Sequence, residues 1–173
     1  MPPFHQPKVI IITGPCGVGK TEITDLFDQQ FDINLIRGDD IKEELFPEIS
    51  NITLYPDKLQ QVKKIIFEQA KDIYHKGQSA VIDYVILGEA YIQTFQQAFG
   101  RDLYFFVLLP DLETIYKRDE ERECWTAGKA VIDHIHERYT TLKKLIGEET
   151  YIDSSHQSPE VTFQHISKYL SSR

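Results

Sequence analysis

The chain has 173 residues, 27 of them acidic and 19 basic, which gives a formal net charge of −8 at pH 7. Its length predicts one domain spanning residues 1–173, large enough to bury about two-thirds of its unfolded surface without a disulfide or a structural metal. The negative charge disfavours a duplex nucleic-acid partner, and the two cysteines, with no leader pattern and no long apolar run, favour a cytoplasmic protein that contacts no membrane.

The first half of the chain alternates apolar runs with segments of helical spacing. Four consecutive β-branched residues, Val9–Ile12, leave no polar face for water and predict a fully buried strand. Asp40 and Glu43 have the spacing of a capping box, which predicts that Asp40 opens a helix. The elements expected in this half are a strand at Lys8–Thr13, a helix from Lys20 to about Gln30, a strand at Ile33–Arg37, a helix through Phe46, and a long helix from Asp57 to about Lys76.

The second half repeats this alternation. Asp111 is placed to cap a helix, and Ser158 followed by Pro159 is typical of a helix start. The elements expected here are a strand at Ser79–Asp83, a helix between Glu89 and Phe99, a strand at Leu103–Leu109, a helix from Leu112 to about Glu123, a helix carrying Val131, Ile135, Tyr139, Leu142 and Ile146, a strand at Thr150–Asp153, and a final helix.

Strands that alternate with helices of this length predict an α/β fold in three layers, with a parallel sheet covered on both faces. Carboxylates follow the strands at their C-terminal ends, where open sheets of this kind bind ligands. They are Asp39, Asp40, Asp83 and Asp153.

The segment Gly14–Thr21 has the spacing of a Walker A phosphate-binding loop and directly follows the first strand. A phosphate chain needs bare backbone N–H groups around it and a helix N-terminus facing it. Gly14, Gly17 and Gly19 would form the turn, while Pro15, Cys16 and Val18 fill its free positions. Lys20 would reach the outer phosphates and the Thr21 hydroxyl would bind Mg²⁺. The alternative is an ordinary glycine-rich turn with a surface lysine.

Phosphoryl transfer also needs a group that accepts the proton of the attacking hydroxyl. Asp39 and Asp40 would stand across the cleft from the loop, one as this base and one as a helix cap, and we expect Asp39 to be the base. Asp83 would hold a magnesium-bound water or contact the acceptor, unless it only caps the next turn.

Positive charge near the transferring phosphate is expected from Arg118 and Arg122, which lie four residues apart before an interruption that contains Trp125. The competing interpretation is surface pairing with neighbouring glutamates, which contributes less than about 1 kcal/mol per exposed pair.

These residues resemble the P-loop kinases, the AAA-type ATP-binding, small kinase-like proteins that include polynucleotide kinase, chloramphenicol phosphotransferase, gluconate and shikimate kinases and the zeta toxins. The resemblance runs from Val9 to about Leu170. It is most specific at Gly14–Thr21, Arg37–Ile41, Val81–Asp83, and Lys117–Arg118 with Arg122, Ala130–Val131 and Tyr139.

The resemblance implies a five-stranded sheet in the order 2-3-1-4-5 with a short helical lid at about residues 118–132. It implies that Asp39 is the general base, that Arg122 contacts the transferred phosphate, and that adenine lies near Arg118 and the loop 153–155. Lys42 stands where the polynucleotide-kinase branch has an arginine, so phosphate binding of that type is not expected to carry over unchanged. Acceptor contacts are expected from Asp39, Lys42 and Asp83.

The sequence therefore predicts an enzyme that uses ATP and Mg²⁺ to phosphorylate a hydroxyl of a small molecule. Two other functions stay open: a kinase of nucleotide or oligonucleotide ends, and a nucleotide-binding regulatory protein without phosphotransfer activity. Oligomeric state is not predicted.

Overall fold

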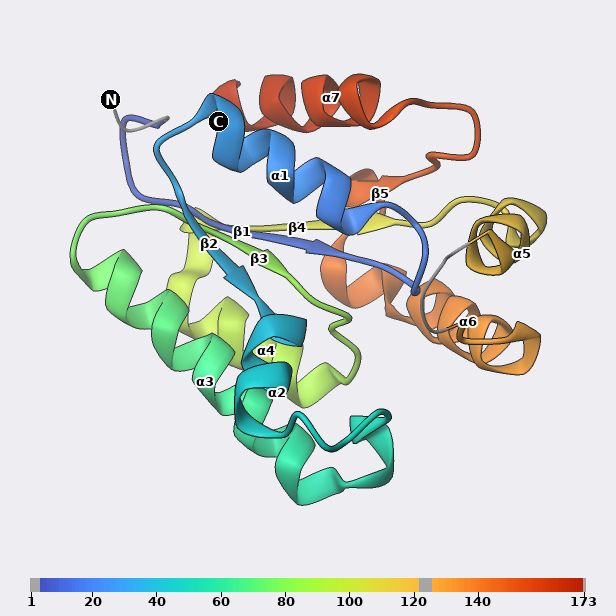
Figure 1. Ribbon diagram of the computed structural model, residues 1–173. Helices are drawn as coiled ribbons and strands as arrows, with labels where there is room; N and C mark the ends of the chain where they lie inside the picture. Colours follow the sequence, from blue (N-terminus) through green and yellow to red (C-terminus); the bar gives the residue numbers. More distant parts are fainter. Residues whose placement is uncertain (1–3, 122–125, 173) are drawn as a thin grey trace.

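The structure, a computed structural model, describes residues 4–121 and 126–172. Its five strands form one parallel sheet in the order β2-β3-β1-β4-β5, which confirms the expected fold class and strand order (Figure 1). The strands are β1 (Val9–Thr13), β2 (Asn34–Arg37), β3 (Ala80–Asp83), β4 (Leu103–Leu108) and β5 (Tyr151–Ile152).

Helices cover both faces of the sheet. Figure 1 shows α1 and α7 on one face and α3 and α4 on the other, so the molecule has three layers. The helices are α1 (Lys20–Gln30), α2 (Gly38–Leu45), α3 (Pro56–His75), α4 (Glu89–Phe99), α5 (Leu112–Glu120), α6 (Lys129–Ile146) and α7 (Pro159–Ser171), with 3₁₀ turns at Ile52–Leu54, Gly100–Asp102 and Glu148–Thr150. Within the described part of the chain, none of the helices combines the length and apolar character that a membrane crossing needs.

The central strand β1 is buried on both of its faces. Val9 and Ile11 belong to a core cluster shared with α3, α4 and α6. Ile10 and Ile12 point the other way, into a cluster shared with α1 and α7. A run of four apolar residues is therefore required here, because alternate side chains enter two different cores.

Two helix starts have the predicted caps. The Asp111 carboxylate accepts a hydrogen bond from the Thr114 N–H at 2.7 Å. Ser158 accepts one from the Val161 N–H at 3.4 Å, with Pro159 in the first turn, where its missing N–H leaves no bond unmade.

The capping box predicted for Asp40 and Glu43 is wrong. Helix α2 begins at Gly38, directly after β2, and its cap residue is Arg37, whose side chain makes no capping bond. Asp39 and Asp40 both lie in the first turn, where the helix dipole favours negative charge. The helix starts two residues earlier than predicted, at a glycine whose missing Cβ leaves room for the ring of Tyr84.

The start of α6 also differs from the simple apolar pattern. Val131 is 44% exposed, whereas Ile132, Tyr139 and Leu142 are buried. The first turn of α6 faces a cleft rather than the core. The buried residue in this turn is therefore Ile132, one position after the Val131 that the apolar pattern predicted. The lid expected at about 118–132 comprises the end of α5 and the start of α6, and its residues 122–125 lie outside the described part of the chain.

Candidate functional site

A cavity of about 1220 Å³ opens at the C-terminal ends of the strands. It is lined by the Gly14–Thr21 loop, α2, α3, the turn after β3, the first turns of α6, and the loop between β5 and α7. This is the edge of the sheet that the strand-terminal carboxylates indicated.

The glycine loop is shaped by its neighbours. A Cβ at Gly14 would lie 2.3 Å from the Leu108 carbonyl oxygen of β4, so no other residue fits there. Gly19, with φ +94°, is the cap residue of α1 and provides no side chain to bond the first amides of the helix. These N–H groups remain available to an anion, as a phosphate site requires.

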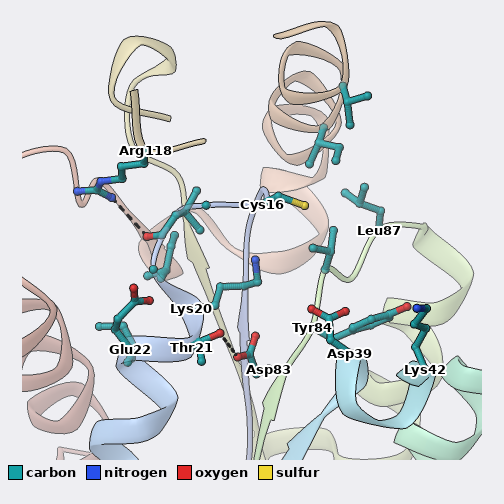
Figure 2. A pocket seen from close by; sticks show the side chains of 18 of the residues that line it. Cys16, Lys20, Thr21, Glu22, Asp39, Lys42, Asp83, Tyr84, Leu87 and Arg118 are labelled. Carbon is teal, nitrogen blue, oxygen red and sulfur yellow. Dashed lines mark hydrogen bonds between the residues drawn. The ribbon is translucent and has the colours of Figure 1, made fainter. Parts of the chain in front are cut away.

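Lys20 folds back over this loop. Its Nζ donates hydrogen bonds to the carbonyl oxygens of Gly14 at 3.2 Å and Pro15 at 2.8 Å. Val18 is buried in the core and anchors the loop, while Cys16 is half-buried beside the cavity as a free thiol. Figure 2 shows Lys20 between the side of the cavity that carries Arg118 and the side that carries Asp39 and Tyr84.

Thr21 and Asp83 meet beneath the loop. The Thr21 hydroxyl donates to Asp83 Oδ2 at 2.9 Å (Figure 2). The Thr24 hydroxyl donates to the same oxygen at 3.3 Å. Asp83 is 8% exposed. Burial raises its pKa, and the Lys20 charge and the Thr21 hydrogen bond oppose that rise. Strand β1 pairs with β3, and Ile12 lies opposite Asp83. This pairing brings Asp83 next to the loop that leads from β1 to Thr21.

This donor set fits Mg²⁺. A hydroxyl and a carboxylate at hydrogen-bond distance are the hard oxygen ligands that Mg²⁺ prefers, beside a loop that leaves room for phosphates. Asp83 bonds the hydroxyls of α1 rather than capping its own turn. Thr24, one helical turn after Thr21, was not identified from the sequence.

The two aspartates of α2 separate clearly. Both are exposed, but Asp39 lines the cavity and Asp40 does not. The negative charge of Asp39 adds to the rise in the pKa of Asp83, which places the two carboxylates within electrostatic reach of each other. Of the pair, therefore, only Asp39 is positioned to meet a ligand.

Tyr84 forms the wall next to Asp39, and the sequence analysis missed it. A Cβ at Gly38 would lie 2.1 Å from Cδ2 of the Tyr84 ring, so glycine is needed for the ring to pack on the start of α2. Tyr84 is 8% exposed and lines the cavity. Burial and the Asp39 charge raise its pKa, so its hydroxyl remains protonated at neutral pH. The glycine directly before Asp39 was the available signal.

Lys42 lies one helical turn after Asp39 and also lines the cavity. Its side chain is 15% exposed, and Nζ donates to the Glu43 carboxylate at 3.0 Å.

Arg118 ties the loop to the far end of the cavity. One guanidinium nitrogen donates to the Val18 carbonyl at 3.4 Å and the other to the Ser154 carbonyl at 3.0 Å. These bonds hold Arg118 in place, and among the described residues it forms no ion pair with a glutamate. The Ser154 hydroxyl is buried beside the cavity and has no hydrogen-bond partner in the described part of the chain. Asp153, a strand-terminal carboxylate expected near the ligand, accepts a hydrogen bond from the Ser155 N–H at 2.9 Å and so caps its own turn.

The return of the chain from α5 to α6 is held by Asp119, a buried residue that the sequence did not reveal. Its two carboxylate oxygens accept the N–H groups of Ala127 and Gly128, each at 3.0 Å. Arg122, expected to contact the transferred phosphate, and Trp125 both lie outside the described residues.

Further along α6, Tyr139 anchors the helix to the sheet. Its buried hydroxyl is 2.6 Å from the Thr13 hydroxyl, which also accepts the Ile86 N–H at 2.9 Å. The end of β1, the turn after β3 and the middle of α6 are thus joined directly behind the phosphate loop.

A model of the AAA domain family matches residues 9–142. Among curated protein sequences, none matches the chain significantly. The fold is similar to that of a tunicamycin resistance protein from Deinococcus radiodurans, with a TM-score of 0.71 and 14% identity, covering 95% of this chain and 96% of that one. It is similar to a shikimate kinase from Bacteroides thetaiotaomicron, with a TM-score of 0.66 and 12% identity, covering 94% and 98%.

A chain of the Pnkp1/Rnl/Hen1 RNA repair complex is also similar, with a TM-score of 0.66 and 19% identity, covering 82% of this chain and 47% of that one. At such identities the likeness concerns the fold, and the family match covers more than half of the sequence. The chain therefore belongs to the AAA domain family, and its fold is that of the P-loop kinases.

Proposed function

We propose that this protein is a phosphotransferase that uses ATP and Mg²⁺ to phosphorylate a hydroxyl group of a small molecule. The observation that carries the proposal is the Thr21–Asp83 hydrogen bond at 2.9 Å beneath the glycine loop, with Asp39 across the same cavity. Such a site combines phosphate binding, ligands for a metal and a carboxylate aimed at the acceptor side.

In the proposed mechanism, the loop amides and Lys20 bind the β- and γ-phosphates. Thr21 and Asp83 would hold Mg²⁺, which would neutralise charge on the phosphate oxygens. Asp39 orients the acceptor hydroxyl and takes its proton as the hydroxyl oxygen bonds to the γ-phosphorus. The bond from that phosphorus to the bridging oxygen breaks, and ADP leaves.

Arg122 is proposed to stabilise the charge on the transferred phosphate, by the family resemblance. Arg118 and the loop 153–155 are proposed to flank the adenine. The unpartnered Ser154 hydroxyl supports this placement, because a buried hydroxyl favours a site at which a ligand provides its missing hydrogen bond.

Two features support a small acceptor. The net charge of −8 repels long polyanions, and the acceptor side of the cavity is lined by residues of α2, α3 and α6. The likeness to a shikimate kinase agrees with this interpretation, although it rests on the fold alone.

The proposal is tested by incubating the protein with γ-labelled ATP, Mg²⁺ and a panel of hydroxylated metabolites, antibiotics, nucleosides and short oligonucleotides. We expect label to transfer to a small molecule and to require Mg²⁺. Lys20→Ala should abolish transfer without unfolding the protein. Binding of ATP with no transfer to any acceptor, under conditions in which a known kinase is active, would contradict the proposal.

A second candidate is a kinase of nucleotide or oligonucleotide ends. One observation favours it: the likeness to a chain of an RNA repair complex. It predicts that oligonucleotides in the same panel are labelled at their ends and that small sugars and antibiotics are not.

A further inference from the structure

Lys63 on α3 is a half-buried cation beside the cavity. Its Nζ lies 5.4 Å from the centroid of the Tyr91 ring and makes no ion pair or hydrogen bond with any described residue. Two other lysines of this region have carboxylate partners: Lys42 pairs with Glu43 and Lys58 with Glu48, at 3.0 and 3.2 Å. Burial lowers the pKa of Lys63, and a negative group beside it would raise that pKa again.

The packing of the helices places Lys63 at the acceptor end of the cavity. Lys63 is carried by α3, which packs against α2, the helix that carries Asp39. Tyr91 fixes α3 to α4, because its hydroxyl donates to the Lys63 carbonyl at 2.6 Å. Lys63, Asp39 and Tyr84 line the same cavity, so the lysine and the proposed base face one ligand space.

Leu59 lies one helical turn before Lys63 and lines the same cavity. The ammonium group lies beside the Tyr91 ring, and the apolar Leu59 side chain lines the same cavity. An anion placed there would be partly removed from water, where its attraction to the lysine is stronger than at a fully exposed site. In a protein of net charge −8, such a position selects a negative group that the rest of the surface repels.

We propose that Lys63 binds an anionic group of the acceptor, a carboxylate or a phosphate ester on the same molecule that offers its hydroxyl to Asp39. This inference rests on the proposed function and narrows its substrate class from hydroxyl compounds to anionic ones. Lys63 is thereby a specificity-determining residue: it fixes the end of the acceptor remote from the reacting oxygen.

The test compares matched acceptors that differ only in charge: a neutral sugar or polyol, its carboxylate form and its phosphate ester. Binding of each is measured by calorimetry to the full-length protein loaded with Mg²⁺ and a non-hydrolysable ATP analogue, and turnover is measured separately with ATP. The variants are Lys63→Met, which keeps the packing on Tyr91, and Lys63→Arg, which keeps the charge. Lys64→Met is the matched control, because Lys64 is the next residue on α3 and is exposed away from the cavity.

We expect at least one anionic series to bind more tightly than its neutral counterpart. Lys63→Met should weaken that binding about tenfold to a hundredfold, the loss typical of a charge-assisted hydrogen bond. Lys63→Arg should retain most of it, Lys64→Met all of it, and none of the three should alter affinity for the ATP analogue. Whichever anionic series binds more tightly identifies the group as carboxylate or phosphate.

Equal binding of neutral and anionic compounds, a panel in which nothing binds, or Lys63→Met with unchanged affinity would overturn the inference, while turnover of a neutral acceptor would leave the proposed function standing. Anion-selective binding lost in Lys63→Met, with no turnover of any acceptor, would support the anion site and contradict the proposed function.

Discussion

Asp39 and Asp40 are adjacent in the sequence but differ in what they can reach, because only Asp39 faces the cavity. We predict that Asp39→Asn lowers kcat about a hundredfold or more, since the amide cannot accept the hydroxyl proton. ATP affinity should be unchanged, because Asp39 lies across the cavity from the phosphate loop (Figure 2). Steady-state kinetics and nucleotide titration measure the two effects.

Asp40→Asn is the matched control and should retain near-normal turnover. If Asp39→Asn were as active as the unaltered protein, the base assignment would be wrong. If it lost neither ATP binding nor biological effect in a protein with no measurable transfer, the regulatory alternative would be favoured.

Asp83 provides a prediction that depends on pH. Burial raises its pKa above the ordinary value of an aspartate, so the folded protein holds that proton more tightly than the unfolded chain does. The corresponding stability is full below about pH 4 and is lost as pH rises through the raised pKa. At neutral pH the ligand-free protein therefore carries a buried carboxylate that opposes folding.

We predict that Asp83→Asn raises the melting temperature of the ligand-free protein by a few degrees at neutral pH, with little change below about pH 4. The amide oxygen can still accept the Thr21 hydrogen bond. The same variant should lose most of the added stabilisation by Mg²⁺ with ATP, because one metal ligand is gone. Calorimetry from pH 4 to 8 measures both; an unchanged or lower melting temperature at pH 7 would count against a buried, charged Asp83.

Among single residues, the sequence revealed those whose role depends on local spacing. The glycines and Lys20 follow a fixed pattern, and Asp83 ends an apolar strand. It did not reveal Tyr84 or Lys63, because ordinary surface residues of the same types look identical until tertiary contacts bury them. Only Gly38 carried a trace of that packing, since a bare position beside Asp39 implies that something approaches closely.

At the level of elements, the connection between α5 and α6 depends on one buried carboxylate. We predict that Asp119→Ala lowers the free energy of unfolding by about 1–3 kcal/mol, because the N–H groups of Ala127 and Gly128 lose their acceptors. Protease should also cut the chain between these helices more readily, since its return would no longer be fixed. Denaturant unfolding and limited proteolysis test this.

Glu120→Ala is the control, because Glu120 is adjacent on α5 but exposed. Asp119→Asn should show an intermediate loss, since an amide retains a single acceptor oxygen. Equal protease sensitivity in all three proteins would show that other contacts fix the connection.

Most element positions followed from periodicity, and the errors occur where tertiary contacts replace local rules. Helix α2 starts at Gly38, where the ring of Tyr84 packs, and no capping pattern records that contact. The first turn of α6 exposes Val131 because it faces the cavity. Both departures border the candidate site, and functional sites are where a chain is expected to depart from local sequence rules.

For the whole molecule, alternation of strands and helices indicated a parallel sheet, while the strand order came from the resemblance to P-loop kinases. That order places β1 between β3 and β4, so the phosphate loop, Asp83 and Leu108 converge. The dimensions of the cavity and the residues that line it could not be predicted, since they depend on how several separate segments of the chain pack together.

Nucleotide binding at this convergence should stabilise the entire fold. We predict that Mg²⁺ with ATP at about a hundred times its Kd adds roughly 2.7 kcal/mol and raises the melting temperature by about 5–10 °C. Differential scanning calorimetry over a series of ATP concentrations measures the shift. Gly14→Ala should abolish it, because its methyl group would strike the Leu108 carbonyl; an equal shift in that variant would place the nucleotide elsewhere.

The bonds that Lys20 makes to the carbonyls of Gly14 and Pro15 have a consequence for the energetics of ligand entry. An incoming triphosphate must release this ammonium group from its own loop, so association exchanges one set of contacts for another instead of adding to it. A single phosphate ion offers Lys20 few contacts in exchange for the two it gives up, whereas a longer phosphate chain offers more. The self-bonded lysine thus discriminates by ligand length before any chemistry begins.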